Sequence, residues 1–210
     1  IDKYGADSLR FMLITGNAPG NDLRFHFERL EAARNFANKI WNASRFALMH
    51  LEQYEPQAVA DPQYSLADRW IMDRRQEVVN RVGECLDKYE LGEAARAIYE
   101  FIWNELCDWY IELIKPRLYG KVNNTSKITA QRTLYDTLSI AMQLLHPFMP
   151  FITEEIWHKL PGKRGSIMQS KWPVSKALQD SSNVNEMQLI MEVIKGLRNV
   201  RAEMNVPPTK

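Results

Sequence analysis

Polar side chains of an unusual kind repeat at helical spacing between residues 33 and 51. At about 100° per residue, the apolar positions of the segment 32–53 share one side of a helix: Ala33, Phe36, Ile40, Ala47 and Leu51. The opposite side carries Asn35, Asn38, Asn42, Arg45 and Phe46, with Arg34 and Lys39 beside it. Solvated helix faces are normally built from Glu, Lys and Gln, whereas Asn favours caps and turns. Helix formation alone therefore does not account for this face.

These residue types could read an unpaired nucleic-acid base. Asn presents a donor beside an acceptor, which matches the edge of adenine, and Arg presents a donor fork for base acceptors or phosphate. The ring of Phe46 is a flat platform for an unstacked base. Just upstream, Arg24 and Phe25 form a second cation–aromatic pair. The alternative is that the polar face packs on another protein domain.

Charge alone does not hold a nucleic acid or a membrane here. The 210 residues contain 27 Lys and Arg against 26 Asp and Glu, which leaves a formal net charge of +1. This balance excludes a non-specific binder that depends on bulk charge. Between residues 22 and 45 there are five basic and three acidic side chains. RNA recognition there would depend on shape and hydrogen bonds.

The cysteine content and the apolar runs indicate a cytoplasmic protein. Cys85 and Cys107 cannot form a disulfide framework, and no CxxC pair offers a zinc site, so we expect reduced thiols. Unbroken apolar runs such as 11–14 are far shorter than the ~20 residues of a membrane span. No signal peptide opens the chain. Because the sequence begins at Ile1 without an initiator Met, we expect a piece of a longer protein.

The elements that would position these residues are helices. Apolar side chains at helical period predict helices over 32–53, 66–89, 92–115, 127–146 and 185–204, with a short helix over 153–160. Ser65 and Asp68 predict a helix start, and the Lys115-Pro116 and His146-Pro147 pairs predict two helix ends. The segment 161–172 is expected to be a loop or a short strand. The predicted fold is all-α, an antiparallel bundle of about five main helices.

Catalytic motifs are missing from the sequence. It contains no phosphate-binding GxxxxGK[ST], no GxGxxG, no HExxH and no recognisable nucleophile motif. Glu155 and His158 match the ExxH of di-iron bundles, but no second ExxH exists, so we interpret them as surface residues. Asp108 and Glu112, four residues apart, are interpreted as members of structural ion pairs or hydrogen bonds. We expect no catalytic residue, no metal and no bound cofactor.

Several segments resemble one enzyme family in order along the whole chain. They are YGADSLRF (4–11), APGNDLRF (18–25), ARNFANKIWNASRF (33–46), CDWYIE (107–112) with Lys115-Pro116, HPFMPFITEE (146–155) and RAEMNVPP (201–208). Together they closely resemble the bacterial valyl-tRNA synthetases, which are class I aminoacyl-tRNA synthetases. The CDWY and His-Pro segments are shared in looser form with related class I enzymes.

The resemblance implies three domains or parts of domains, and it implies that the catalytic activity lies outside this chain. Residues 1–20 would be a stem-contact link from an absent catalytic domain, 21–165 the helical anticodon-binding bundle, and 166–210 the start of a truncated C-terminal module. The family's ATP- and Mg-dependent chemistry and its editing activity would lie outside this chain, which would not activate valine by itself. The implied partners are the anticodon stem-loop of tRNA(Val) and the catalytic domain of the same polypeptide, in a monomer without membrane contact.

The resemblance also suggests roles for the polar face. We hypothesise that Asn38, Asn42 and Arg45 hydrogen-bond unstacked anticodon bases and that Phe46 stacks on one of them. Arg24 and Phe25 would clamp the other side. Two alternatives stay open: a helical domain-docking module that contacts no RNA, and the equivalent domain of an isoleucyl or leucyl enzyme.

Overall fold

The computed structural model describes residues 2–15, 25–52, 54–55, 61–120, 124–162, 165–174 and 182–206. Within these ranges the chain is helical and has no strand, which confirms the predicted all-α fold. The elements are α1 (Ala6–Thr15), α2 (Phe27–Leu51), α3 (Leu66–Asp87), α4 (Leu91–Glu100), a π-helical segment η1 (Phe101–Tyr110), α5 (Ile111–Tyr119), α6 (Asn124–Leu145), α7 (Pro150–Lys159), a 3-10 turn η2 (Ile167–Gln169) and α8 (Ser182–Glu203).

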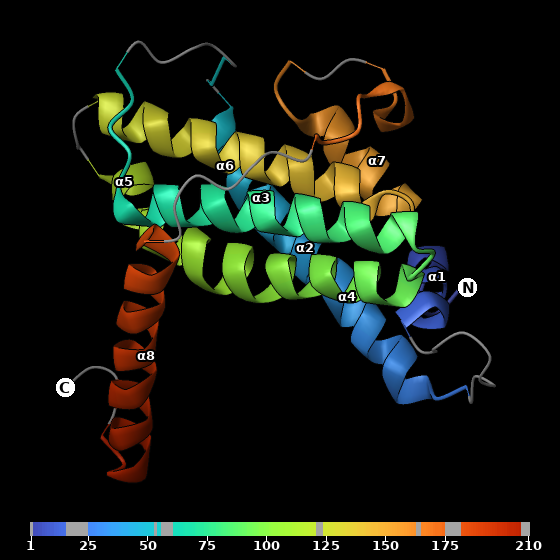
Figure 1. Cartoon of the computed structure of the whole chain (residues 1–210), viewed down its shortest axis with the longest axis horizontal. Helices are drawn as coiled ribbons and strands as arrows, with labels where there is room; N and C mark the ends of the chain where they lie inside the picture. The colour runs from blue at the N-terminus through green and yellow to red at the C-terminus, as the bar shows by residue number, and fades with distance from the viewer. Residues whose placement is uncertain are drawn as a thin grey trace.

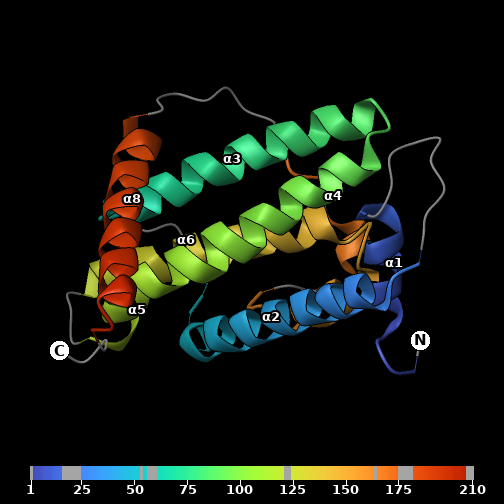
Figure 2. The same cartoon turned by 90° about the horizontal axis from the view of Figure 1, so that it is seen from below.

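The long helices run side by side and share one core. α3 lies antiparallel to the continuous run α4–η1–α5, α6 packs on α3 and α5, and α2 crosses obliquely against η1 and α6 (Figures 1 and 2). α1 packs on α2, α4 and α7. α8 projects from the α5 end of the bundle and packs on α3 (Figure 1). None of the described helices is both long and apolar enough to cross a bilayer.

The run from residue 91 to residue 119 is one continuous helix whose middle part has wider, π-helical turns. The N–H of Ile111 donates to the carbonyl of Leu106, five residues back, which is the π-helical pattern. Buried side chains along this run stand four residues apart: Ala94, Ile98, Ile102, Leu106, Tyr110, Ile114 and Leu118. In a pure α-helix such a row drifts by about 40° at each step. The wider turns of η1 offset this drift and keep the row facing the core.

The predicted helix end at Lys115-Pro116 is wrong, because α5 continues through Pro116 to Tyr119. Proline removes one backbone donor. Burial of Ile114 and Leu118 on either side offsets that loss. Arg117 also holds this last turn in place, since its guanidinium donates to the hydroxyl of Ser126 at 3.0 Å and to the carboxylate of Asp68.

Asp68 joins three elements at a buried point. The Ser65 hydroxyl caps the Asp68 N–H, and the Asp68 carboxylate accepts from the Ser65 N–H at 2.8 Å, so the predicted start of α3 is confirmed as a capping box. The same carboxylate accepts from the hydroxyl of Tyr110 at 2.8 Å and pairs with Arg117. α3, η1 and α5 are thereby fixed relative to one another.

The first helix is joined to the α6–α7 corner by two polar contacts. The Asp7 carboxylate accepts from the N–H of Ile152 at 2.7 Å and of Phe151 at 3.3 Å, and so caps α7 from a distance. Arg10 donates to the carbonyl of Pro147 at 3.1 Å. These contacts explain why α7 begins at Pro150, three residues before the predicted start. The YGADSLRF and HPFMPFITEE segments are therefore structural partners.

The remaining predicted boundaries differ from the structure by a few residues. α2 begins at Phe27, five residues before the predicted start, and α6 ends at Leu145, immediately before the predicted His146-Pro147 stop. The segment 161–172 contains the turn η2. The domain boundaries at 20/21 and 165/166 stay predictions, although Phe11 of α1 and Ile167 of η2 belong to the common core.

Candidate nucleic-acid interface

The apolar stripe predicted for the second helix is buried, and the polar face is exposed. Ala33, Phe36, Ile40, Ala47 and Leu51 of α2 all lie in the core. Asn35, Asn38, Asn42 and Arg45 are exposed on the outer side of the same helix. We call Asn38, Asn42 and Arg45 the α2 ridge.

The side chains of the α2 ridge are available to a ligand. Asn38, Asn42 and Arg45 make no hydrogen bond or ion pair to another described residue. The two asparagines are one helical turn apart, and Arg45 follows almost one turn later, so the three form a row about 10 Å long. Their donors and acceptors could contact two adjacent bases.

The cations that flank the ridge already have partners. Lys39 Nζ lies 2.7 Å from the Asp108 carboxylate and 3.8 Å from the centre of the Trp103 ring. Arg34 pairs with Glu31 at 3.2 Å and lies over Tyr4. Arg45 is therefore the α2 cation best placed for an RNA phosphate or base.

Phe46 is half-buried at the edge of the ridge, where the sequence predicted an exposed ring. It turns toward α5 and packs against His50, whose ring centre is 4.6 Å away. Lys115 Nζ lies 5.6 Å from the Phe46 ring centre, and Tyr119 follows at 6.2 Å. We call Phe46, His50 and Tyr119 the aromatic cluster.

Two members of the aromatic cluster were missed by the sequence reasoning. His50 lies one turn beyond Phe46 on the same helix, a spacing that could have indicated contact. Tyr119 lies beyond Pro116, where the helix was expected to have ended. Burial lowers the pKa of His50, and the nearby positive charge of Lys127 lowers it further, so the imidazole is neutral at pH 7.

Phe25, one member of the proposed clamp, lies at the other end of α2 from Phe46. Phe25 is exposed just before α2 and packs edge-on against Phe27, with ring centres 5.3 Å apart. Nineteen residues separate Phe27 from Phe46 on one helix, a distance of about 28 Å. Phe25 and Phe46 therefore cannot hold one base between them. Arg24 lies outside the described residues.

The residues that resembled catalytic groups are engaged in ion pairs. Asp108 pairs with Lys39, and Glu112 pairs with Lys115 at 2.6 Å, which confirms their structural interpretation. Glu155 and His158 are exposed, and His158 contacts Glu154 at 2.9 Å. No group of three or more His, Cys, Asp or Glu side chains among the described residues could hold a metal.

Both cysteines are free thiols, as expected. Burial raises the pKa of Cys107 to about 12 and outweighs the opposing effect of the nearby Lys39 charge. Cys85 is buried, and its pKa is also raised by burial. Neither thiol is a nucleophile at neutral pH.

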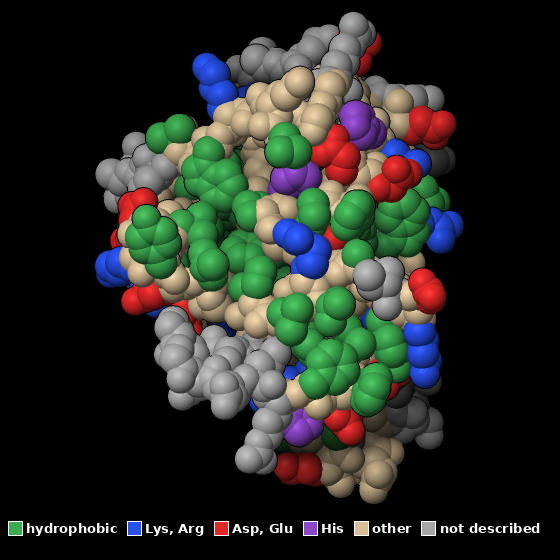
Figure 3. Space-filling model, turned by 90° about the vertical axis from the view of Figure 1, so that its right-hand side faces the viewer, with side chains coloured by type: hydrophobic (Ala, Val, Ile, Leu, Met, Phe, Trp, Pro, Cys, Tyr) green, Lys and Arg blue, Asp and Glu red, His purple; other side chains and the backbone are tan. Residues whose placement is uncertain are grey.

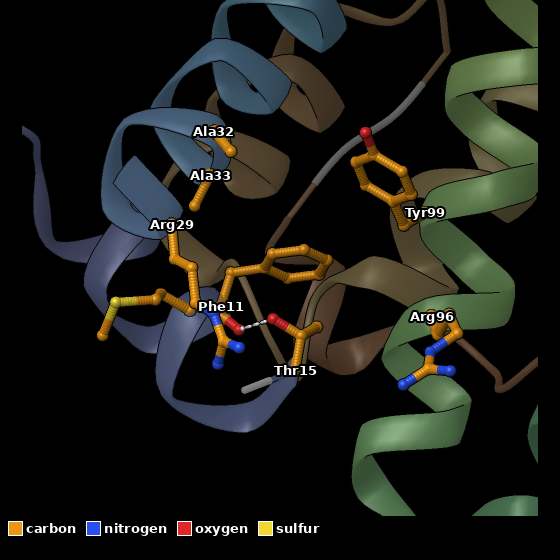
Figure 4. Close-up of a pocket in the computed structure, with 8 residues that line it drawn as sticks. Phe11, Thr15, Arg29, Ala32, Ala33, Arg96 and Tyr99 are labelled. Atoms are coloured by element: carbon orange, nitrogen blue, oxygen red, sulfur yellow. Dashed lines mark hydrogen bonds between the residues drawn. The ribbon is translucent and has the colours of Figure 1, made fainter. Parts of the chain in front are cut away.

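A cavity of about 380 Å³ lies between α1, α2 and α4 (Figure 4). Phe11, Ala32 and Ala33 give it an apolar floor, while Arg29 and Arg96 reach it from facing helices (Figure 4). The described residues that line it include no carboxylate, histidine or cysteine, so they supply no acid–base or nucleophilic group.

Comparisons with known proteins agree with the helical fold. Residues 68–210 match the family described as the anticodon-binding domain of tRNA ligase. The chain belongs to this family. Because α1 and α2 lie before the matched residues, the α2 ridge itself is outside that match.

Relatives extend the similarity to the whole chain. It is 59% identical over 211 residues to a valine–tRNA ligase of Carboxydothermus hydrogenoformans and 54% identical over 212 residues to one of Clostridium acetobutylicum. Each alignment covers 100% of this chain but 24% of the relative, so the chain spans about a quarter of their length. The anticodon-binding domain therefore corresponds to one part of these longer relatives.

A solved structure supports the fold. A leucyl-tRNA synthetase from Agrobacterium radiobacter, in a ternary complex with tRNA and LeuAMS, superposes with a TM-score of 0.62 at 18% identity. The superposition covers 83% of this chain and 20% of that one. At this identity the likeness shows the helical fold shared by the two proteins.

Proposed function

We propose that this chain is the part of a valine–tRNA ligase that recognises the anticodon of tRNA(Val). The observation that carries the proposal is the α2 ridge, three exposed side chains with base-reading chemistry and no partner among the described residues. Valine anticodons share an adenine at the second position and a cytosine at the third. Asn matches the adenine edge, while the amide carbonyl of Asn can accept from the cytosine amino group.

The aminoacylation chemistry belongs to the rest of the longer protein in this proposal. ATP, Mg²⁺ and valine would bind there, and this chain would position the tRNA. The similarity to valine–tRNA ligases, at 59% and 54% identity, extends over 100% of this chain. It supports the choice of the valine enzyme over the isoleucine or leucine enzymes.

The end of the molecule at which α1 lies fits contact with the catalytic domain. Hydrophobic side chains gather on that end (Figure 3). Leu13 of α1 and Phe151 of α7 are exposed, and Phe151 lines a shallow hollow with residues 4–8. An apolar surface rimmed by polar residues marks a protein interface. We place the contact with the catalytic domain here and the RNA on the α2 ridge.

Binding of tRNA(Val) transcripts with single anticodon changes tests the proposal. Replacing the second anticodon base should weaken binding about 5- to 150-fold, since one bidentate contact is worth about 1–3 kcal/mol. A transcript with one acceptor-stem pair inverted is the matched control. Equal affinity for the native and altered anticodons would refute anticodon reading.

Two further measurements separate the alternatives. A domain-docking module without RNA contact would show no tRNA affinity, or an affinity indifferent to salt, whereas phosphate contacts give a log–log salt slope of roughly −0.7 to −0.9 per contact. Preference for tRNA(Ile) or tRNA(Leu) in a panel of transcripts would favour the related enzymes.

A further inference from the structure

The aromatic cluster offers a second kind of RNA contact beside the ridge. Tyr119 is 66% exposed, although its ring is held by neighbours: it meets the His50 ring edge-on, with centres 4.7 Å apart and an interplanar angle of 88°. Phe46 packs in the same group, with its ring centre 6.2 Å from that of Tyr119. The Tyr119 ring is thus fixed in orientation while much of its surface faces solvent.

The surroundings of the cluster carry positive charge. Arg45 is exposed next to Phe46 in the sequence, Lys115 lies over the Phe46 ring, and Lys127 is close enough to lower the pKa of His50. Among the described residues, Glu112 pairs with Lys115 and offsets part of this charge. An exposed aromatic ring in a cluster with cations nearby offers stacking to an unpaired base and attraction to its phosphate.

We propose that Tyr119 is the outer stacking platform of the anticodon site and that one unpaired base of the anticodon loop lies on its exposed face. In this arrangement Phe46 and His50 hold the platform, and Arg45 is the ridge residue that directly precedes Phe46 in the sequence. The proposal rests on the proposed function and names a contact residue on α5 that sequence reasoning did not.

The order of the helices makes this placement possible. Tyr119 follows Lys115 by one turn on α5, and both face the part of α2 that holds Phe46 and His50. The ridge supplies hydrogen-bond donors and acceptors, while the cluster supplies an aromatic surface without charge, since His50 is neutral at pH 7. A base that unstacks from the anticodon loop toward α5 would stack on the exposed face of the Tyr119 ring. The adjacent base would then contact Asn42 or Arg45.

The test measures base stacking directly. tRNA(Val) is prepared with a single 2-aminopurine at each anticodon-loop position in turn, and its fluorescence is followed on binding to the 210-residue chain. Stacking on Tyr119 should quench one position, and Tyr119→Ala should remove that quenching and weaken binding about 5- to 150-fold. Tyr119→Phe should retain both properties, because the ring and not the hydroxyl makes the contact.

Tyr89 provides the matched control. It is 84% exposed in the turn between α3 and α4, at the other end of the bundle from α5 (Figure 2). Its φ of 59° is tolerated by asparagine. Tyr89→Asn should leave quenching and affinity unchanged.

The outcomes distinguish this inference from the proposed function. If the unaltered chain does not bind tRNA(Val), the proposed function fails. If it binds with anticodon preference but Tyr119→Ala binds and quenches equally well, only the stacking platform is refuted. Loss of binding in Tyr119→Phe as well would assign the contact to the hydroxyl and overturn stacking. Circular dichroism melting of each variant confirms that the fold is retained.

Discussion

The hydroxyl of Tyr110 donates to Oδ1 of Asp68 at 2.8 Å across 42 residues of sequence. Both side chains are buried, and the other carboxylate oxygen of Asp68 is held by Ser65 and Arg117. Burial raises the pKa of Tyr110 well above its ordinary value, and the Asp68 charge raises it further. The phenol therefore stays protonated and remains a donor.

Tyr110→Phe should lower the free energy of unfolding by about 1–3 kcal/mol, because it leaves one buried carboxylate oxygen without a donor. Urea unfolding followed by circular dichroism measures the loss. Tyr89→Phe removes an exposed hydroxyl and should change stability very little. A loss for Tyr110→Phe no larger than that of the control would contradict the role of this bond.

Asp7→Ala should destabilise the chain by about 0.5–2 kcal/mol, because α7 loses the carboxylate that caps the N–H groups of Phe151 and Ile152. Asp7→Asn should cost less, since the amide retains one acceptor oxygen. Asp61→Asn, at an exposed position, is the control for a change in charge. Similar unfolding midpoints for Asp7→Ala and the unaltered chain would show that the cap contributes nothing.

Asn42→Ala should weaken tRNA(Val) binding and reduce the penalty for a changed anticodon base by about 1–3 kcal/mol. Its stability should be equal or slightly higher, since alanine is the better helix former. Asn104→Ala removes an exposed asparagine from η1 and serves as the comparison. Unaltered base preference in Asn42→Ala would remove this residue from the readout.

Phe46→Ala should affect both stability and RNA affinity. The ring is half-buried, so its removal should cost about 1–2 kcal/mol of unfolding free energy. Affinity should fall as well, because the aromatic cluster loses its support. Binding is measured by titration below the melting temperature of the variant. A stability loss with unchanged affinity would make Phe46 a packing residue only.

The free energy of unfolding should fall as the pH rises above about 8.5. A free thiol ionises near that pH in the unfolded chain, whereas burial raises the pKa of Cys107 to about 12 in the folded chain. Stability from this group is complete below pH 8.5 and is lost between pH 8.5 and 12, by up to about 1.4 kcal/mol per pH unit.

Cys107→Ala should make this decline less steep between pH 9 and 10. Cys85 acts in the same direction, so part of the decline should persist. Urea unfolding at a series of pH values gives both slopes. Equal slopes for the variant and the unaltered chain would show that the Cys107 thiol is ionised as easily in the fold as outside it.

Apolar spacing predicted the helices well where burial alone determines them. The apolar stripe from Ala33 to Leu51 lies in the core as expected. When apolar side chains repeat every 3.6 residues on one side of a helix and polar side chains cover the other, only the apolar side can face the core. The passage through Pro116 could not be predicted locally, since it depends on contacts that Arg117 makes with Asp68 and Ser126. The four-residue spacing of buried side chains from 94 to 118 was the available signal for the π-helical segment.

The candidate site was predictable in part for the same reason. The exposure of Asn38, Asn42 and Arg45 follows from their angular position on α2. The half-buried state of Phe46 depends on α5, which approaches from more than sixty residues later. Helical angle alone could not show which neighbour would cover that flank.

The π-helical segment η1 determines in which direction each side chain of α5 points around the helix axis. Deleting one residue between Phe101 and Tyr110 would turn the downstream helix by about 100° about its axis. Tyr119 would then swing away from Phe46 and His50, although none of the three residues had changed. Ile114 and Leu118 would leave the core by the same rotation, so the wide turns of η1 couple the position of an exposed aromatic ring to the burial of its own helix.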